Sequence, residues 1–244
     1  MPGGAPPVAL DAESRPPYVD GVKWLSHLLD EVKALTAAGT PVTVVFDLDN
    51  TLFDTRERTL LAGQRFDAQH GTTYFKGATA EDMMRDGVET ALHLGLPQSI
   101  ALEFQEFWSV EFWTPANLKV DRPMVDVLAW AHKAKAAGAT VKYLTGRTEP
   151  FHAASVAALK AAGLPTSGED VLCKPNMSVR TTDFKVDRLN QLAAKSTLGF
   201  FLTESRRDLA AVVAGSPAAN PVALDSPFER GSEMPPVPVL PASF

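Results

Sequence analysis

The stretch Phe46-Asp47-Leu48-Asp49-Asn50-Thr51-Leu52 decides the fold, because it places two carboxylates directly after an apolar run. That run, 41–46, is rich in β-branched residues and shows little alternation of polar and apolar positions. Such a pattern is typical of a central parallel strand that is covered on both faces. Ligands of an open parallel sheet bind beyond the carboxyl ends of its strands, so the two aspartates are candidate functional residues.

Apolar runs and helix-like segments alternate on both sides of this stretch. A helix is expected over 20–38, where apolar residues recur every three or four positions and Gly39 provides a stop. Further strands are expected at 140–144, near 171, at 198–202 and at 222–224, and further helices at 122–137, 150–162, 182–194 and 206–214. Repeated strand-then-helix units predict an α/β sheet with right-handed crossovers.

The connection that follows the first strand is unusually long. A strand-to-strand crossover needs roughly 30 residues. The segment from Asp49 to Thr140 is about three times that length. Helical patterns occupy the surplus, at 55–70, at 79–94 with a capping-box spacing of Thr79 and Asp82, and at 99–113. We therefore expect a helical cap inserted after the first strand.

Composition and charge exclude several classes of protein. The 244 residues carry a formal net charge of −6, which opposes general binding to nucleic acid or anionic lipid. A single cysteine, Cys173, cannot form an intramolecular disulfide. Neither an apolar run of about 18 residues nor a signal-peptide pattern occurs in the sequence. We expect a soluble cytoplasmic protein.

The prolines indicate where the folded part begins and ends. Twelve of the 19 prolines fall within the first 17 residues or from Pro217 onward, and proline removes a backbone donor and interrupts helices. The expected organisation is a flexible arm over 1–18, a core formed by 20–52 together with 120–225, a helical cap over 53–119 and a Pro-rich tail over 226–244.

Asp47 and Asp49 can divide the labour of a reaction. Paired carboxylates repel each other and attract a cation, so Mg²⁺ is the expected metal, with one aspartate free to attack and the other to shuttle protons. The alternative is a purely structural strand end, in which Asp49 starts a turn.

Polar residues also follow the later strands, which favours the functional interpretation. Thr145-Gly146-Arg147 supplies a hydroxyl and a backbone N–H that suit a phosphate oxygen. Glu204 and Asp208 add two acids after the strand at 198–202, and Lys185 lies near the start of the preceding helix. The carboxyl ends of parallel strands meet at one edge, so these residues are expected to converge there.

This order of motifs resembles the haloacid dehalogenase superfamily of phosphohydrolases: Asp-x-Asp-x-Thr, a strand-end Thr-Gly, a lysine at a helix start and a strand-end acid cluster. The resemblance covers about residues 40–225 and is most specific at 47–51. It implies a three-layer Rossmann-like α/β core, in which the helical insert corresponds to the small mobile cap of that superfamily.

The resemblance also implies roles for individual residues. Asp47 would be the nucleophile that forms an aspartyl-phosphate, and Asp49 the general acid/base. Thr145 would hold a phosphoryl oxygen, and Lys185 would neutralise charge on the nucleophile and the phosphoryl group. Thr51, Gly146 and Arg147 are further candidate substrate contacts, and the candidate Mg²⁺ ligands are Asp47, Asp49 through its main-chain carbonyl, Glu204 and Asp208.

Two positions depart from the superfamily pattern or leave it open. The fourth motif usually begins Gly-Asp but reads Thr203-Glu204 here, which moves the carboxylate out by one methylene. Lys174, at the end of a short strand, competes with Lys185 for the role of motif lysine, and the helix-start position favours Lys185.

Other clusters have simpler interpretations. The rings of Phe104, Phe107, Trp108, Phe112 and Trp113 could line a pocket, but their helical spacing favours the cap's own core. The arginines that follow the first motif, Arg56, Arg58 and Arg65, could reach a second anionic group of the substrate, but a solvated helix face is the favoured interpretation.

The sequence thus predicts a Mg²⁺-dependent phosphatase acting on a small phosphorylated substrate, with neither a membrane nor nucleic acid as partner. Three alternatives stay open: a phosphomutase, a phosphonatase, and a non-catalytic protein that binds a phosphate ligand, the last motivated by Glu204. The oligomeric state is not encoded in any pattern described above.

Overall fold

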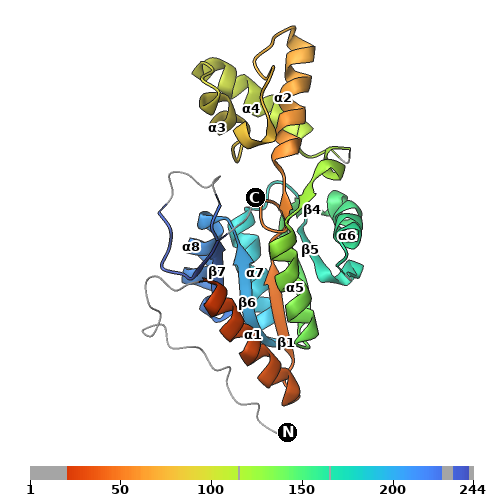
Figure 1. Ribbon diagram of the computed structural model, residues 1–244, viewed down its shortest axis with the longest axis vertical. Helices are drawn as coiled ribbons and strands as arrows, with labels where there is room; N and C mark the ends of the chain where they lie inside the picture. The colour runs from red at the N-terminus through yellow and green to blue at the C-terminus, as the bar shows by residue number, and fades with distance from the viewer. Residues whose placement is uncertain (1–20, 115, 165, 227–232, 242–244) are drawn as a thin grey trace.

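The computed structural model describes residues 21–114, 116–164, 166–226 and 233–241. A parallel sheet forms the lower part of the molecule in Figure 1, and a group of helices stands above one end of it. The six strands of the sheet follow the order β5-β4-β1-β6-β7-β8, and every neighbouring pair is parallel. They span Val42–Phe46 (β1), Thr140–Thr148 (β4), Val171–Lys174 (β5), Thr197–Thr203 (β6), Pro221–Leu224 (β7) and Val239–Leu240 (β8).

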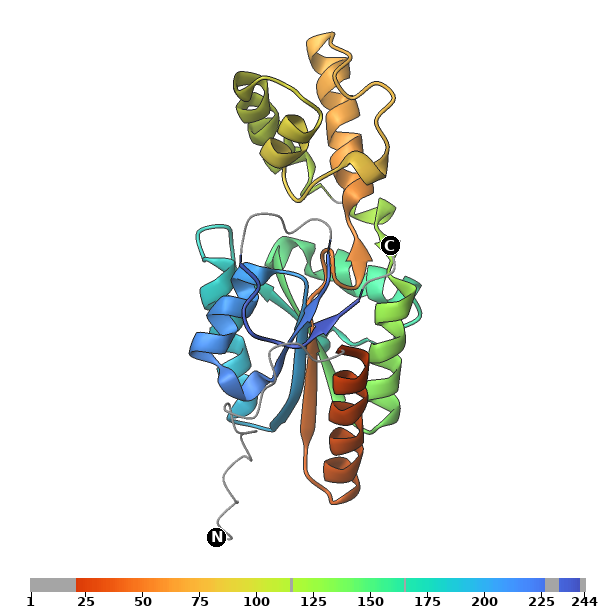
Figure 2. The ribbon, with the colours of Figure 1, turned by 60° about the vertical axis from the view of Figure 1, so that its left-hand side comes forward.

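Helices cover both faces of this sheet, as the β-branched run at its centre predicts. All five residues of β1 are buried; Val44 packs with one hydrophobic cluster and Val45 with another. The first cluster includes residues of α1 (Gly21–Ala37), α5 (Val125–Ala136) and α6 (His152–Ala161), and the second includes residues of α7 (Thr181–Ala193) and α8 (Arg206–Gly215). Figure 2 shows α1 with α5 and α7 with α8 on opposite sides of the sheet. The predicted three-layer α/β core is confirmed.

The segment after β1 forms the separate helical unit. It contains α2 (Arg56–His70), the 3₁₀ turn Ala80–Asp82, α3 (Gly87–His93), α4 (Gln98–Glu111) and the 3₁₀ turn Asn117–Val120. Its own apolar cluster contains three of the five aromatic rings expected there, Phe104, Trp108 and Phe112, and the other two, Phe107 and Trp113, pack against it. A short antiparallel ribbon of β2 (Phe53–Asp54) and β3 (Arg122–Pro123) connects this unit, the cap, to the core.

The expectation of one continuous helix over 79–94 is wrong. Thr79 and Asp82 do form a capping box, but they cap only a single 3₁₀ turn. A second start follows, because the Asp86 side chain accepts a hydrogen bond from the Glu89 N–H at the head of α3. Two start signals so close together divide the segment into two short elements.

The C-terminal segment also differs from the expected tail over 226–244. Val239 and Leu240 pair with β7 as the edge strand β8, and Leu240 is buried against the core. An apolar Val-Leu pair between prolines is sufficient to add two residues to an open edge. The expected arm over 1–18 lies outside the described residues. In the part of the chain that the structure describes, no helix combines the length and apolarity that crossing a membrane requires.

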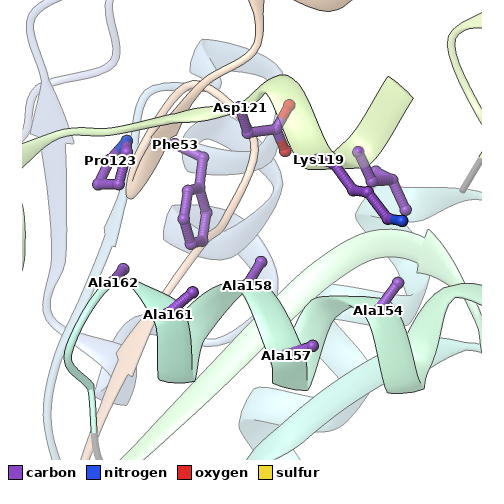
Figure 3. A pocket seen from close by; sticks show the side chains of 10 residues that line it. Phe53, Lys119, Asp121, Pro123, Ala154, Ala157, Ala158, Ala161 and Ala162 are labelled. Carbon is purple, nitrogen blue, oxygen red and sulfur yellow. The ribbon is translucent and has the colours of Figure 1, made fainter. Parts of the chain in front are cut away.

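An apolar cavity of about 370 Å³ lies beside the ribbon that carries the cap. In Figure 3 the Phe53 ring points toward the small side chains of α6, including Ala158 and Ala161. Alanines leave space where larger residues would pack against the ribbon. The cap connection is therefore loosely supported on this side.

Candidate active site between the core and the cap

Most of the sequence-predicted residues converge on one cavity of about 180 Å³ at the carboxyl edge of the sheet. Its lining combines strand-end residues of the core with rings and a cation of the cap. The core contributes Asp47, Asp49, Asn50, Gly146, Thr181, Lys185, Glu204, Ser205 and Asp208, and the cap contributes Arg85, Trp108, Phe112 and Trp113. Three of the aromatic residues thus serve both as cap core and as cavity wall.

A tight turn after β1 presents the two aspartates to this cavity. Asn50 has a left-handed backbone, with φ of 56°, which asparagine tolerates better than most residues. Its Oδ1 accepts hydrogen bonds from the backbone N–H and the hydroxyl of Thr55, at 3.3 and 2.7 Å. The turn therefore reverses the chain immediately after Asp49 and leads it into β2.

Asp47 is buried in a small network of charges. The Lys185 Nζ lies 2.5 Å from its Oδ2, and the Thr203 hydroxyl donates to the same oxygen at 2.8 Å. The second carboxylate on this lysine is Asp208, whose Oδ2 lies 2.6 Å from Nζ. The other Asp47 oxygen, Oδ1, accepts from the Leu48 N–H at 2.8 Å.

These contacts have opposing effects on proton affinity. Burial raises the pKa of Asp47, and Lys185 acts against that rise. Burial also disfavours the charged form of Lys185, but Asp208 and Asp47 outweigh it and hold the lysine pKa above its ordinary value. Lys185 is thus a permanent cation at neutral pH. The structure places Lys185, and not Lys174, against Asp47.

Asp49 lies in a different environment, between two arginines. Arg147 donates from Nε to both carboxylate oxygens, at 3.2 and 3.1 Å, and from Nη2 to Oδ1 at 2.7 Å. Arg58 of the cap donates from Nη2 to Oδ1 at 2.7 Å. Burial opposes ionisation, but Arg147 and Arg58 outweigh it and hold the pKa of Asp49 well below its usual range.

Asp121 completes this cluster from the far side of the ribbon. Arg58 donates from Nε to its Oδ1 at 2.6 Å and from Nη2 to its Oδ2, and Arg147 donates to Oδ2 at 3.0 Å. We call Asp49, Arg58, Asp121 and Arg147 the arginine cluster. It joins the first motif, both segments that enter and leave the cap, and strand β4.

Arg58 and Arg147 differ from their sequence-based expectations. The expected solvated position of Arg58 is wrong, since its side chain is fully buried in the arginine cluster. Arg147 is also fully buried, and its remaining Nη1 donates to the Ser155 hydroxyl at 3.2 Å. Its guanidinium is therefore committed to protein groups, and the geometry does not include the predicted anion contact.

The two motif threonines contact backbone instead of the cavity. The Thr51 hydroxyl accepts from the Glu204 N–H at 3.1 Å and so links the first and fourth motifs. The Thr145 hydroxyl accepts from the Arg147 N–H at 3.1 Å. Both threonines are fully buried, so they position the strand-end loops in this structure.

Gly146 does line the cavity, and its lack of a side chain has a clear reason. A Cβ at this position would lie 3.1 Å from Cγ2 of Thr181. A side chain at this position would therefore require the Thr181 side chain, at the start of α7, to move by a few tenths of an ångström.

The donor set fits Mg²⁺ in part. Mg²⁺ usually takes one or two carboxylates together with substrate phosphate oxygens and water, and Asp47 and Glu204 both line the cavity. Asp208 is bonded to Lys185, and the Asp49 side chain is bonded to arginines. Among the described residues, no three His, Cys, Asp or Glu side chains are grouped as metal ligands. The fit thus rests on Asp47, Glu204 and the Asp49 main chain.

Sequence reasoning missed Asp121, Arg85 and the contact of the Thr203 hydroxyl with Asp47. Asp121 and Arg85 lie far from any motif, and only the folded ribbon and cap bring them to the site. Thr203 does have a signal, because it stands where the superfamily pattern has glycine and its hydroxyl contacts Asp47.

Comparison with solved structures finds the same fold in other proteins. The structure of Protein Tyrosine Kinase A from Mycobacterium tuberculosis matches with a TM-score of 0.58 and 17% identity, over 82% of this chain and 94% of that one. A predicted phosphatase from Clostridium acetobutylicum matches with a TM-score of 0.54 and 12% identity, over the same two shares.

A third match is a haloacid dehalogenase-like family hydrolase from Streptococcus pneumoniae, with a TM-score of 0.51 and 12% identity, over 77% of this chain and 86% of that one. No protein-family model matches the sequence, and neither does any curated protein. Likeness at such identities concerns the fold. The chain has the fold of the haloacid dehalogenase-like hydrolases, a Rossmann-like core with a helical cap inserted after its first strand.

Proposed function

We propose that the protein is a Mg²⁺-dependent phosphatase that hydrolyses a phosphomonoester through an aspartyl-phosphate on Asp47. The observation that carries this proposal is the contact of Asp47 with Lys185, at 2.5 Å, inside a cavity formed jointly by core and cap. Phosphoryl transfer needs a positioned nucleophile and nearby positive charge more than any other feature. Asp47 and Lys185 provide both.

In the first step, an oxygen of Asp47 attacks the phosphorus atom of the substrate. A bond forms between that oxygen and phosphorus, and the bond from phosphorus to the leaving oxygen breaks. Lys185 and Thr203 hold Oδ2, while Oδ1 accepts only the Leu48 N–H among the described contacts. Oδ1 is therefore the better candidate for the attacking atom.

In the second step, water attacks the same phosphorus atom and Asp49 accepts its proton. The Asp47–phosphorus bond then breaks, inorganic phosphate leaves and the free carboxylate returns. This role requires ionised Asp49, which Arg147 and Arg58 enforce. The same arginines disfavour a protonated Asp49 in the resting enzyme, so the leaving oxygen takes its proton from solvent, and the proton that Asp49 accepts from water returns to solvent as the carboxylate re-forms.

Asp47, Glu204 and the Asp49 main-chain carbonyl would hold the metal. When bound, Mg²⁺ supplies positive charge that offsets the repulsion between the carboxylates and the phosphoryl oxygens. Lys185 supplies a fixed charge on the other side of Asp47 in all states of the cycle.

The test is hydrolysis of 4-nitrophenyl phosphate, followed as released phosphate with and without Mg²⁺. We expect turnover that depends on Mg²⁺, and a loss of at least about 10³-fold in Asp47→Asn. Asp30→Asn is the matched control, because Asp30 is an exposed residue of α1 on the core. Equal activity of the Asp47→Asn variant and wild type would refute the proposal.

The fold itself does not settle which group accepts the phosphoryl group, since a protein tyrosine kinase shares it. Release of inorganic phosphate identifies water as the acceptor. Transfer of the phosphoryl group to a second organic molecule would instead support a phosphomutase. Stabilisation by a phosphate ester without turnover would support a non-catalytic binding protein.

A further inference from the structure

A second cavity at the carboxyl edge of the sheet, of about 340 Å³, adjoins the cavity that is lined by Asp47. The two cavities share Arg85, Thr181 and Asp208 in their linings. The remaining lining comes from the end of β5, the loop that follows it and the first turns of α7 and α8: Lys174, Met177, Val179, Arg180, Thr182 and Arg207. The two cavities are therefore neighbours at the carboxyl edge of the sheet.

The lining of this second cavity is strongly cationic. Arg85, Lys174, Arg180 and Arg207 contribute four positive side chains to its lining, against one carboxylate, that of Asp208. That carboxylate is already bonded to Lys185, at 2.6 Å. Arg180 also lies 3.8 Å from the exposed Asp183, outside the lining. The local excess of positive charge stands out in a chain whose net charge is −6.

Lys174 is the informative member of this group. Its side chain lies at the end of β5 with only 5% of its surface exposed. Its Nζ donates to the Val179 carbonyl at 3.2 Å and to the Thr181 hydroxyl at 3.3 Å. Within the described ranges, no carboxylate lies at ion-pair distance from it, in contrast to Lys185, which has two.

Keeping a cation buried without an anionic partner is costly. Burial lowers the pKa of Lys174, with Asp208 acting against that effect. An anion bound in the cavity would supply the missing partner. Arg207 is exposed, also has no carboxylate partner among the described residues, and could contribute to the same anion.

We propose that this cavity, which we call the second anion site, binds a second phosphate group of the substrate. The substrate class is then a small organic bisphosphate, with one phosphate at Asp47 and the other between Lys174, Arg180 and Arg207. Guanidinium groups donate paired hydrogen bonds to phosphate oxygens, and a phosphate dianion neutralises more than one positive charge. This inference rests on the proposed function for the position of the first phosphate.

A small molecule fits these observations better than a nucleic acid. The site is a pocket beside the catalytic cavity, with Arg85 of the cap reaching Ser205 of the core at 3.4 Å. The overall acidity of the chain opposes a long polyanion.

The test compares binding of 1,4-butanediol bisphosphate with binding of 4-hydroxybutyl phosphate, by calorimetry at constant Mg²⁺ and ionic strength. The homologous pairs with three, five and six carbons cover other phosphate separations. All measurements use Asp47→Asn protein, so that the esters are not consumed. We expect at least one bisphosphate to bind roughly tenfold more tightly than its monophosphate.

The double variant Arg180→Gln with Arg207→Gln should bring this ratio close to one and leave monophosphate binding unchanged. Arg188→Gln is the matched control, because Arg188 lies on α7 outside the cavity and donates to Gln191. The double variant on an otherwise wild-type chain should hydrolyse 4-nitrophenyl phosphate at the wild-type rate.

Each result separates this inference from the proposed function. Equal affinity for every bisphosphate and its monophosphate, or a preference that survives in the double variant, overturns the second anion site. Absence of 4-nitrophenyl phosphate turnover overturns the phosphatase proposal alone, because the binding ratio is measured without turnover.

Discussion

Asp47 and Asp49 lie two residues apart on one turn, yet their surroundings differ in almost every respect. Asp47 contacts one lysine and one hydroxyl, all within the core. Asp49 contacts two arginines, one of which comes from the cap. The pKa of Asp47 is raised by burial, whereas the pKa of Asp49 is held well below its usual range.

This difference supports the separate roles that we propose for the two aspartates, which the motif alone cannot distinguish. The Asp47 side has a single fixed cation and a cavity for the phosphoryl group, which suits a nucleophile. The Asp49 side is a permanent carboxylate that is tied to the cap entry through Arg58 and to the cap exit through Asp121. A displacement of the ribbon would therefore act directly on Asp49, the proposed base. It would act on Asp47, the proposed nucleophile, only through the turn between them.

The largest effect should come from Lys185→Met. This change leaves Asp47 and Asp208 buried without their shared cation, which typically costs about 3–5 kcal/mol of the free energy of unfolding. Activity toward 4-nitrophenyl phosphate should fall by about 10³-fold. Urea unfolding and initial rates measure the two losses.

Lys174→Met is the matched control, because both lysines are buried at the same edge of the sheet. Its activity toward this single-phosphate ester should stay within about threefold of wild type, since Lys174 contacts the second cavity. Equal losses in the two variants would remove the distinction between the two lysines.

Arg58→Met tests the Asp49 side. Loss of one cation should raise the pKa of Asp49, because the positive charge that favours its ionised form is reduced. Carboxyl ¹³C chemical shifts followed against pH should show Asp49 titrating at a higher pH than in wild type. Arg56→Met is the control, since Arg56 is paired with Asp54. An unchanged titration of Asp49 in Arg58→Met would contradict the account in which the arginine cluster holds Asp49 ionised.

Glu204→Gln tests the proposed Mg²⁺ site, which includes Asp47. Loss of one carboxylate ligand should raise the Mg²⁺ concentration for half-maximal rate by about 10–100-fold. Asp183→Asn, an exposed change on α7, should leave the Mg²⁺ dependence as in wild type.

The smallest effect concerns stability in acid. The folded pKa of Asp49 is depressed, so its stabilising contribution is complete above the unfolded pKa of about 3.9 and declines as pH falls below it. The difference in unfolding free energy between wild type and Asp49→Asn should shrink by about 1 kcal/mol from pH 5 to pH 3. Urea titrations at the two pH values measure it, and a constant difference would mean that Asp49 is not held ionised.

The residues that the sequence predicted well are those whose roles depend on the sheet. Strand period places Asp47, Glu204 and Asp208 at one edge, and the start of α7 brings Lys185 to them, because parallel strands end together. The helix break at 83–86 was not predicted, since two start signals compete within one apolar pattern.

The arginine cluster could not be predicted for a physical reason. Arg58 and Asp121 are 63 residues apart in the sequence. They come together only because the chain enters and leaves the cap through the same two-stranded ribbon. Nothing in the local pattern around Arg58 distinguishes a buried arginine from a solvated one. Lys174 illustrates the same limit, since only the folded cavity shows that none of the described carboxylates pairs with it.

Reductive trapping during turnover tests the central claim most directly. Borohydride converts an aspartyl-phosphate into homoserine, and peptide mass spectrometry locates the altered residue. We predict homoserine at position 47, only when substrate and Mg²⁺ are present, and none at position 49. Trapping at position 49, or an active enzyme with no trapped residue at position 47, would contradict the assignment of Asp47 as the nucleophile.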